Sequence, residues 1–190
     1  METTTHPIAA FANIEGELPR NLQLLEAANA RQAKDVLLNL QSMFQSEHVS
    51  KKEAALLAIS IAANNHSVAL QKGFEKIASE ESATAEEIAE AVAAASMLAA
   101  NNVLYRFRHF THKEKYQQLQ ARIRMNTMMK PVLGKEFFEL VSLAVSAVNG
   151  CELCVNAHEH SLIELGSSEE RIWESIRIAS IVTSAGKLLA

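Results

Sequence analysis

The sequence predicts an all-α protein. Prolines occur only at positions 7, 19 and 131, so none interrupts residues 20–130, where Gly73 is the one glycine. That stretch is rich in Ala, Leu, Glu, Lys and Gln, which favour helix over strand. No segment shows a convincing alternation of apolar and polar residues at period two, which is typical of a half-buried strand. We therefore expect one helix after another.

Composition and length agree with a single globular domain over residues 1–190. The chain is 48% hydrophobic and 21% charged, with a formal net charge of −4, which excludes disordered and collagen-like classes. A nearly balanced charge provides no global field for nucleic acid, so we expect no nucleic-acid partner. The local basic residues are interpreted as solvated surface. They are Arg106, Arg108, Arg122 and Arg124.

The N-terminal region predicts a polar tail over residues 1–16, followed by preliminary helices to about residue 45. The first residues lack the basic and apolar regions of a secretory signal, so we expect a cytoplasmic protein. The longest uncharged stretch, residues 54–71, contains Asn64, Asn65 and His66 in its middle. These side chains are costly in hydrocarbon, so we interpret the stretch as a buried helix and expect no membrane association.

Three later helices have predicted starting points. A hydroxyl residue followed three positions later by glutamate forms a capping box when it precedes an apolar-periodic run. The pattern occurs at Ser50 with Glu53, at Thr84 with Glu87, and at Ser167 with Glu170. We expect a helix to begin directly after each of the three hydroxyl residues.

An internal repeat emerges when the chain is aligned with itself so that Leu140 lies over Leu56. With this repeat offset, ten residues match without a gap: Leu140, Ala147, Asn149, Glu159, Glu164, Glu170, Ile172, Glu174, Ala179 and Ser180. We predict a degenerate repeat over residues 50–104 and an active-site repeat over residues 134–188. Each copy would be a helical hairpin with a third helix, and the two copies would pack about a pseudo-twofold axis.

The two cysteines occur only in the second copy. Cys151 and Cys154 align with Ser67 and Leu70, and His158 aligns with Phe74. The first repeat is therefore predicted to be scaffold, and the second to carry the functional site.

The cysteines are expected to begin a helix, because Asn149 and Gly150 form a helix-stop signal directly before Cys151. A helix N-terminus favours thiolate over thiol and lowers a cysteine pKa. Spacings of three and four residues place Cys151, Cys154 and His158 on one helix face. In a cytosolic chain such a C-x-x-C pair is typical of dithiol–disulfide cycling.

Glu139 is predicted to join this site by helix geometry. It precedes Gly150 by about three helical turns, and His158 follows Gly150 by about two. In an antiparallel helical hairpin with a rise of about 1.5 Å per residue, Glu139 and His158 come roughly level. The carboxylate would then orient the imidazole.

Other interpretations of these residues remain open. The two thiolates with His158 and either Glu139 or His160 would supply four zinc ligands, although structural zinc sites seldom take ligands in this layout from one helix. Two inert buried cysteines are also possible. No glycine-rich phosphate loop or dinucleotide fingerprint is present, so reducing equivalents would come from a partner protein or a small thiol rather than a bound cofactor.

The remaining histidines have no partner at a useful sequence spacing. We interpret them as surface residues or as residues with satisfied hydrogen bonds. They are His48, His66, His109 and His112.

The motif pattern resembles the AhpD-type alkyl hydroperoxidases of the carboxymuconolactone decarboxylase-like superfamily. It consists of Glu139, then Ser146-Ala147-Val148-Asn149-Gly150-Cys151-x-x-Cys154, then Ala157-His158-Glu159-His160. Residues 101–106 and 119–126 also look like that subfamily, and the resemblance covers about residues 18–189. It implies an all-α fold with internal pseudo-symmetry, a homotrimer, and reduction of organic peroxides.

The resemblance also implies roles for the site residues. Cys154 would be the peroxidatic cysteine that becomes a sulfenic acid, Cys151 would resolve it to a disulfide, and Glu139 with His158 would be the proton relay. No metal or bound cofactor is implied. The partners would be an AhpC-type peroxiredoxin and, as reductant, a dihydrolipoamide-type thiol on a lipoyl-bearing dehydrogenase component.

One departure from the family pattern is Leu153, which stands between the cysteines where well-known members carry a second relay histidine. This predicts a weaker relay, which affects direct peroxidase activity more than disulfide exchange. Two alternatives come from other classes: a helical interaction protein whose cysteines sense oxidation, and a decarboxylase-like enzyme that shares only the fold.

Overall fold

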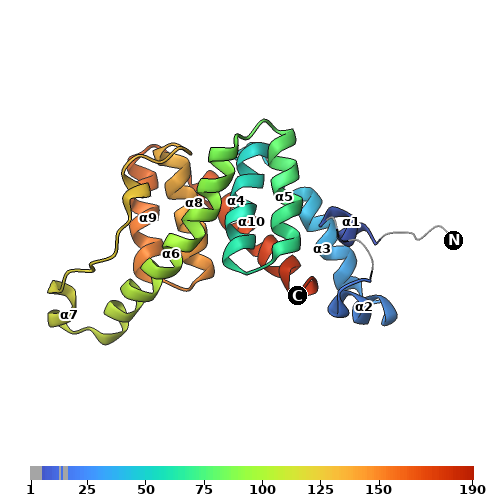
Figure 1. Ribbon diagram of the computed structural model, residues 1–190, viewed down its shortest axis with the longest axis horizontal. Helices are drawn as coiled ribbons and strands as arrows, with labels where there is room; N and C mark the ends of the chain where they lie inside the picture. Colours follow the sequence, from blue (N-terminus) through green and yellow to red (C-terminus); the bar gives the residue numbers. More distant parts are fainter. Residues whose placement is uncertain (1–5, 13, 15–16) are drawn as a thin grey trace.

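The computed structural model describes residues 6–12, 14 and 17–190, and within them every regular element is a helix (Figure 1). The predicted all-α class is therefore confirmed. The elements are α1 (Pro7–Phe11), α2 (Arg20–Ala27), α3 (Arg31–Ser42), α4 (Lys51–Asn64), α5 (Val68–Glu80), α6 (Ala85–Thr111), α7 (Glu114–Gln118), a 3₁₀ helix (Asn126–Met129), α8 (Lys135–Val148), α9 (Glu152–Glu164) and α10 (Glu169–Leu188).

Helix α1 corrects part of the predicted polar tail over residues 1–16. The His6 side chain caps it by accepting a hydrogen bond from the Ile8 backbone, and Ile8 is completely buried. Gly73 of α5 allows this approach, because a Cβ there would lie only 2.6 Å from the carbonyl oxygen of Phe11. The apolar residues of α1 thus find a core contact on α5. Residues 1–5, 13, 15 and 16 of the predicted tail lie outside the described residues.

The helix bounds follow the repeat offset that the sequence comparison predicts. With that offset, α8 begins and ends over α4, α9 begins and ends over α5, and α10 begins over α6. Two surface hollows are related in the same way, one lined by Ala63, Ala95 and Ser96 and the other by Ala147, Ala179 and Ser180. These relations support the repeat, and the pseudo-twofold axis between its copies stays a prediction.

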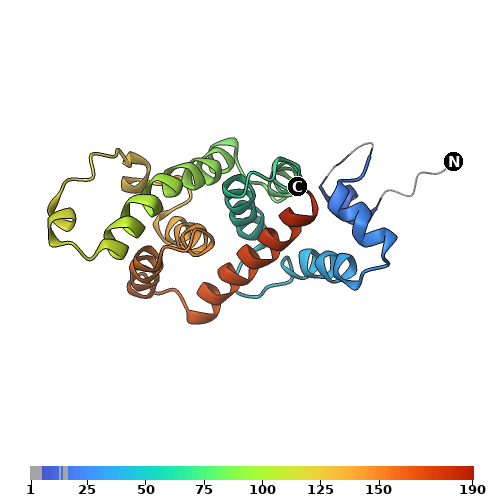
Figure 2. The ribbon, with the colours of Figure 1, turned by 90° about the horizontal axis from the view of Figure 1, so that it is seen from below.

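Helices α4 and α8 form the centre of the structure and contact each other. Helix α4 also packs against α5, α6 and α10, and α8 against α6, α9 and α10. Figure 2 shows α10 extending from the α8–α9 hairpin toward the N-terminal helices α2 and α3. Every residue from 54 to 62 of α4 and from 140 to 146 of α8 is buried. This burial on all sides explains the uninterrupted apolar sequences of both helices.

Two of the three predicted capping boxes are present, at Ser50 and at Thr84. The third helix is instead capped by Ser168, whose hydroxyl accepts a hydrogen bond from the Arg171 backbone. The predicted cap, Ser167, donates its hydroxyl to Glu136 on α8 over 2.6 Å. A contact with a distant helix has therefore moved the start of α10 by one residue.

The uncharged stretch over residues 54–71 is two helices rather than one buried helix. Helix α4 ends at Asn64, and His66 takes a left-handed conformation with φ of 57° before α5 begins at Val68. Asn65, Ser67 and their neighbours favour such a turn because their short polar side chains compete with helical hydrogen bonds. The same polar residues that argue against a membrane span thus divide the stretch.

Helix α6 has the length and hydropathy of a possible membrane span, the one such helix among the described residues. Its packing is that of a core helix, since it contacts α4 and α8. Its buried Glu90 accepts hydrogen bonds from the backbone N–H groups of Val132 and Leu133, at 2.9 and 2.6 Å. The C-terminal half of α6 crosses the α8–α9 hairpin and leads to α7 at one end of the molecule (Figure 1).

Arg171 joins α10 to both central helices. Its guanidinium donates to Glu136 of α8 at 2.8 and 2.9 Å and to Glu53 of α4 at 2.6 Å. The hydrogen bond from Arg171 holds the pKa of Glu136 below its usual range. Burial raises the pKa of Glu53, but hydrogen bonds from Arg171 and Ser50 outweigh it and leave the pKa below its ordinary value. The arrangement therefore stabilises the charged forms of both carboxyls.

Replacing this arginine tests how much the network stabilises the fold. Arg171→Met should lower the free energy of unfolding at neutral pH by about 2 kcal/mol, because hydrogen bonds to charged groups are lost. A depressed carboxyl pKa contributes stability above the unfolded-state value that is lost as the pH falls through the folded-state value. The difference between the two proteins should thus shrink in acid.

Urea unfolding of both proteins over a series from neutral to acidic pH measures this difference. Arg31→Met is the matched control, because the ion pair of Arg31 with Asp35 is exposed and should contribute almost nothing. A deficit in Arg171→Met that stays constant through the acidic range would contradict the assignment.

Candidate functional site

A disulfide joins Cys151 and Cys154 at the start of α9. Helix α8 ends at Val148, Gly150 takes a φ of 67°, and the Cys151 backbone donates to the carbonyl of Ser146 at 3.1 Å. Cys151 is the N-cap residue of α9, as the helix-stop signal predicts. The Cα atoms of the two cysteines are 5.3 Å apart, and both side chains are buried. The pair therefore lies at a helix N-terminus inside the protein.

His158 and Glu139 meet across the α8–α9 hairpin. The Nδ1 atom of His158 lies 2.6 Å from Oε2 of Glu139, and both side chains are largely enclosed. A carboxylate beside Nδ1 favours a proton on that nitrogen, so Nε2 is the ring nitrogen left to take up or release a proton. The structure thus brings together the two residues that the helix lengths on either side of Gly150 predict to be level.

The candidate residues on α9 lie on its buried face. The buried residues of this helix are Cys154, His158 and Leu162, each four positions after the last. This face packs toward α8 and α6, which both contact α9. Glu159 and His160 are exposed, and His160 pairs with Glu164 at 3.4 Å in solvent. All four predicted site residues therefore belong to one buried region, and His160 does not.

Side-chain amides hold the turn that precedes the cysteines. Asn149 and Asn64 of α4 exchange two hydrogen bonds, of 2.9 and 3.1 Å. Asn149 also donates to Asn102 of α6 at 2.9 Å, and Asn102 donates to Ser146 at 3.0 Å. Arg106, one turn further along α6, donates to the Asn149 carbonyl. Three helices therefore position the start of α9.

Known relatives cover most of this chain. It is 39% identical over 166 residues to alkyl hydroperoxide reductase AhpD of Anaeromyxobacter sp. strain K, a match of 86% of this chain and 88% of that protein. Proteins of the same name from Bradyrhizobium sp. strain ORS 278 and Coxiella burnetii strain Dugway 5J108-111 are 41% and 38% identical. These matches cover 80% and 82% of this chain, and 83% and 89% of the relatives.

The carboxymuconolactone decarboxylase family model also matches, over residues 114–190. The chain belongs to the AhpD family. Its all-α structure agrees with that membership, and the Cys151–Cys154 pair fits the C-x-x-C pattern.

Sequence reasoning missed the contributions of α6 in this AhpD-family chain. The sequence predicts a solvated Arg106, but this side chain is half-buried and bonded to the turn. It predicts no partner for His109, but the Nε2 of His109 lies 3.4 Å from Oε2 of Glu152, the first residue of α9. The ring of His112 packs against His109 with centroids 5.6 Å apart. Arg106 and Asn149 are 43 residues apart in sequence, so helical spacing could not reveal such partners.

The sequence nevertheless carries a signal for these residues. Residues 101–106 are among the segments that resemble the family, and two of them, Asn102 and Arg106, hold the turn before the cysteines. A segment outside the cysteine motif that resembles the family thus indicates residues whose contacts hold the turn.

The geometry offers little to a metal ion. Among the described residues, no group of three or more His, Cys, Asp or Glu side chains is arranged to hold one. The exposed position of His160 removes it from the alternative zinc set. Leu153, between the two cysteines, is 39% exposed. The residues present therefore favour thiol chemistry.

Proposed function

We propose that this protein reduces organic hydroperoxides with Cys154 and Cys151 and also serves as a disulfide reductant of an AhpC-type peroxiredoxin. The observation that carries the proposal is the disulfide at the N-terminus of α9, on the same buried helix face as the His158–Glu139 pair. The names of the relatives support a peroxide-reducing oxidoreductase.

The first step is attack by the Cys154 thiolate on the distal oxygen of the hydroperoxide. The S–O bond forms while the O–O bond breaks, and the alkoxide leaves with the electron pair of that bond. His158, polarised by Glu139, takes up the thiol proton as the Cys154 thiolate forms and then delivers it to the alkoxide, which becomes an alcohol. Cys154 is thereby oxidised to a sulfenic acid.

The second step closes the disulfide that the structure contains. The Cys151 thiol gives up its proton and its sulfur attacks the Cys154 sulfur, the S–O bond breaks, and the departing hydroxide takes that proton to form water. A dihydrolipoamide-type dithiol on a lipoyl-bearing dehydrogenase component then reduces the disulfide and is itself oxidised to a cyclic disulfide. This cycle needs no resident cofactor and would run in the cytoplasm, where thiols are kept reduced.

The start of α9 supplies the activation of the thiol. Unpaired backbone N–H groups and the helix dipole stabilise negative charge in the first turn, where Cys154 lies two residues after the first helical residue, Glu152. Leu153 leaves the relay with one histidine on this helix. The proposal therefore assigns more of the proton transfer to Glu139 and His158 than a relay with two histidines would.

Thiol counting and turnover test the cycle. Oxidised protein should show no free thiol in denaturant and two per chain after reduction, because the chain has two cysteines. Stopped-flow mixing of reduced protein with an organic hydroperoxide should yield one alcohol per disulfide formed, and dihydrolipoamide should sustain turnover. Two free thiols after peroxide treatment would exclude the cycle. Stoichiometric zinc in elemental analysis would favour the metal alternative, and oxidation without turnover would favour a redox sensor.

Substitutions of Glu139 and His158 test the relay. Glu139→Gln keeps the side-chain volume but removes the charge, and the peroxidase rate should fall by about 10²–10⁴-fold. His158→Phe should do similar damage, and the first repeat already carries Phe74 at the matching position. The double variant should be little slower than either single variant, because both residues act as one unit.

Steady-state rates from about pH 6 to 8 measure the relay. His160→Gln is the control, since His160 is exposed and should leave the rate unchanged. Full peroxidase and disulfide-exchange rates in Glu139→Gln across this range would mean that the helix terminus alone activates the thiol.

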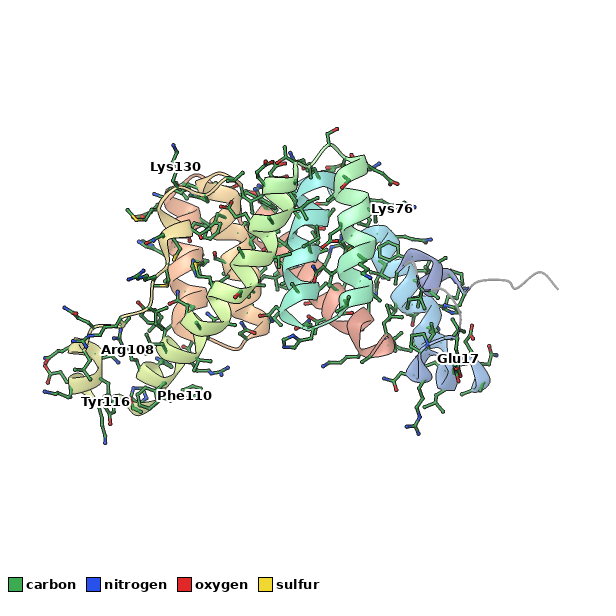
Figure 3. All side chains as sticks on the ribbon, in the orientation of Figure 1. Glu17, Lys76, Arg108, Phe110, Tyr116 and Lys130 are labelled. Carbon is green, nitrogen blue, oxygen red and sulfur yellow. A yellow bond between two sulfur atoms is a disulfide. The ribbon has the colours of Figure 1, made fainter. Side chains whose placement is uncertain are left out.

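We also propose a homotrimer. Residues 91–100 are partly covered by α4 and α8 within the chain, so the large exposed apolar side chains lie further along α6. Val103, Phe107 and Phe110 are 60%, 47% and 67% exposed. The Phe107 ring packs against Tyr116 of α7 at 5.1 Å, and Figure 3 shows Phe110 and Tyr116 at the far end of the molecule. A second copy would cover this surface.

Light scattering checks the assembly. The expected mass is three times the 20.8 kDa of one chain. Phe110→Glu should lower it by placing a charge in the apolar surface, whereas Lys76→Glu, on α5, should not. A mass near 20.8 kDa at every protein concentration would contradict the trimer.

A further inference from the structure

Ser142 of α8 carries a buried hydroxyl that has no hydrogen-bond partner. Its Oγ and the Oδ1 of Asn101 are the two such buried side-chain atoms among the described residues. Ser142 has no exposed surface. A buried helical serine ordinarily bonds to a carbonyl, as Ser60 of α4 does to the Ala91 carbonyl at 2.8 Å. The lone hydroxyl of Ser142 is therefore an unused group in a tightly packed core.

The position of Ser142 follows from the register of the α8–α9 hairpin. The contact of Glu139 with His158 places these two residues level. Ser142 lies three residues after Glu139, about 4.5 Å along α8, and Cys154 lies four residues before His158, about 6 Å along α9 in the antiparallel direction. Ser142 and Cys154 are thus level to within about 1.5 Å.

Both residues also lie on the facing sides of their helices. Glu139 lies three residues before Ser142 on α8. Residues three or four apart share a helix face, so the two side chains lie on the same face of α8. Cys154 falls on the α9 face that bears His158, and both are buried. The two faces meet at the Glu139–His158 contact, so helix geometry places Ser142 on the side of α8 that faces α9, at the level of Cys154.

The first repeat shows which residues occupy these positions in a hairpin that has no cysteines. The residues of the first repeat that align with the site residues are apolar and buried. They lie on α4 and α5, which have the same lengths as α8 and α9. Glu139, Ser142, Cys154 and His158 correspond to Ala55, Ala58, Leu70 and Phe74. The helical hairpin therefore packs well with alanine at the position of Ser142. Packing does not require the hydroxyl, which occurs in the repeat that carries the cysteines.

We propose that the Ser142 hydroxyl donates a hydrogen bond to the Cys154 sulfur when the cysteine pair is reduced, and so stabilises the Cys154 thiolate. A thiolate carries a full negative charge and is a strong acceptor, whereas a disulfide sulfur is a weak one. This difference explains why the hydroxyl has no partner while the disulfide is closed. The inference rests on the proposed dithiol–disulfide cycle, but not on peroxide being the oxidant.

The contribution of Ser142 is separable from the charges around it. Glu139 and His158 face Cys154 from α8 and from its own helix, Glu152 lies 3.4 Å from His109 at the start of α9, and Arg106 binds the preceding turn. All of them change the local field together. Ser142 is neutral and buried, so its replacement removes one hydrogen bond and leaves every one of these charges in place.

The test compares Ser142→Ala with two other variants. Ser60→Ala is the matched control, because it removes a buried serine hydroxyl from α4 in the first repeat. Ser142→Thr retains the hydroxyl. The Cys154 pKa is measured in a Cys151→Ser background from the pH dependence of alkylation by iodoacetamide. The thiol–disulfide equilibrium constant is measured in the full dithiol protein against dihydrolipoamide.

Ser142→Ala should raise the Cys154 pKa by about one unit, because a hydrogen bond to a charged group is lost. It should shift the equilibrium about tenfold toward the disulfide, which corresponds to a reduction potential about 30 mV more negative. Ser142→Thr should restore both values toward the parent, and Ser60→Ala should change neither.

Three results would overturn the inference. They are values in Ser142→Ala within twofold of the parent, an equal shift in Ser60→Ala, and a parent disulfide that dihydrolipoamide does not open. The last result would also end the proposed cycle. A parent protein that exchanges disulfides but consumes no hydroperoxide would end the peroxidase proposal alone and leave the role of Ser142 intact.

Discussion

The hydrogen bonds of Asn149 are the contact on which the rest of the site depends. This side chain has one carbonyl and two N–H bonds, and partners on α4 and α6 occupy all three through Asn64 and Asn102. An unpartnered buried polar group costs about 1–3 kcal/mol, so displacing the turn would leave the buried Asn102 amide oxygen without its partner. The α8–α9 turn is therefore fixed against two other helices. Because Cys151 follows two residues later, the disulfide inherits that position.

Beyond this turn, the remaining site residues follow one another along the α8–α9 hairpin. Cys154 lies in the first turn of α9, where the helix terminus favours an anion, and His158 lies one turn deeper against Glu139. The equivalent hairpin of α4 and α5 has the same helix lengths but apolar residues at the matching positions. Similar packing thus supports one hairpin with thiol chemistry and one without it.

The surroundings of the site come from outside the hairpin. Helix α6 contributes Asn102, Arg106 and His109 to the turn and to the start of α9. Helix α10 holds the far end of α8 through Arg171 and Glu136, and it holds α4 through the same arginine. Helices α6 and α10 therefore hold α4 and α8 at opposite ends. A change in either long helix would alter the site without replacing a cysteine.

The sequence by itself determined the helical class, two of three capping boxes, the offset at which the helix bounds recur and the proximity of Glu139 to His158. Each depends on spacing along one helix or one hairpin, where geometry follows directly from residue count. Tertiary structure decided that α1 packs on Gly73, that α10 begins after Ser168, and that Arg106 and His109 reach the start of α9. These contacts join residues far apart in the chain, so the crossing of the helices, rather than their periodicity, selects the partners.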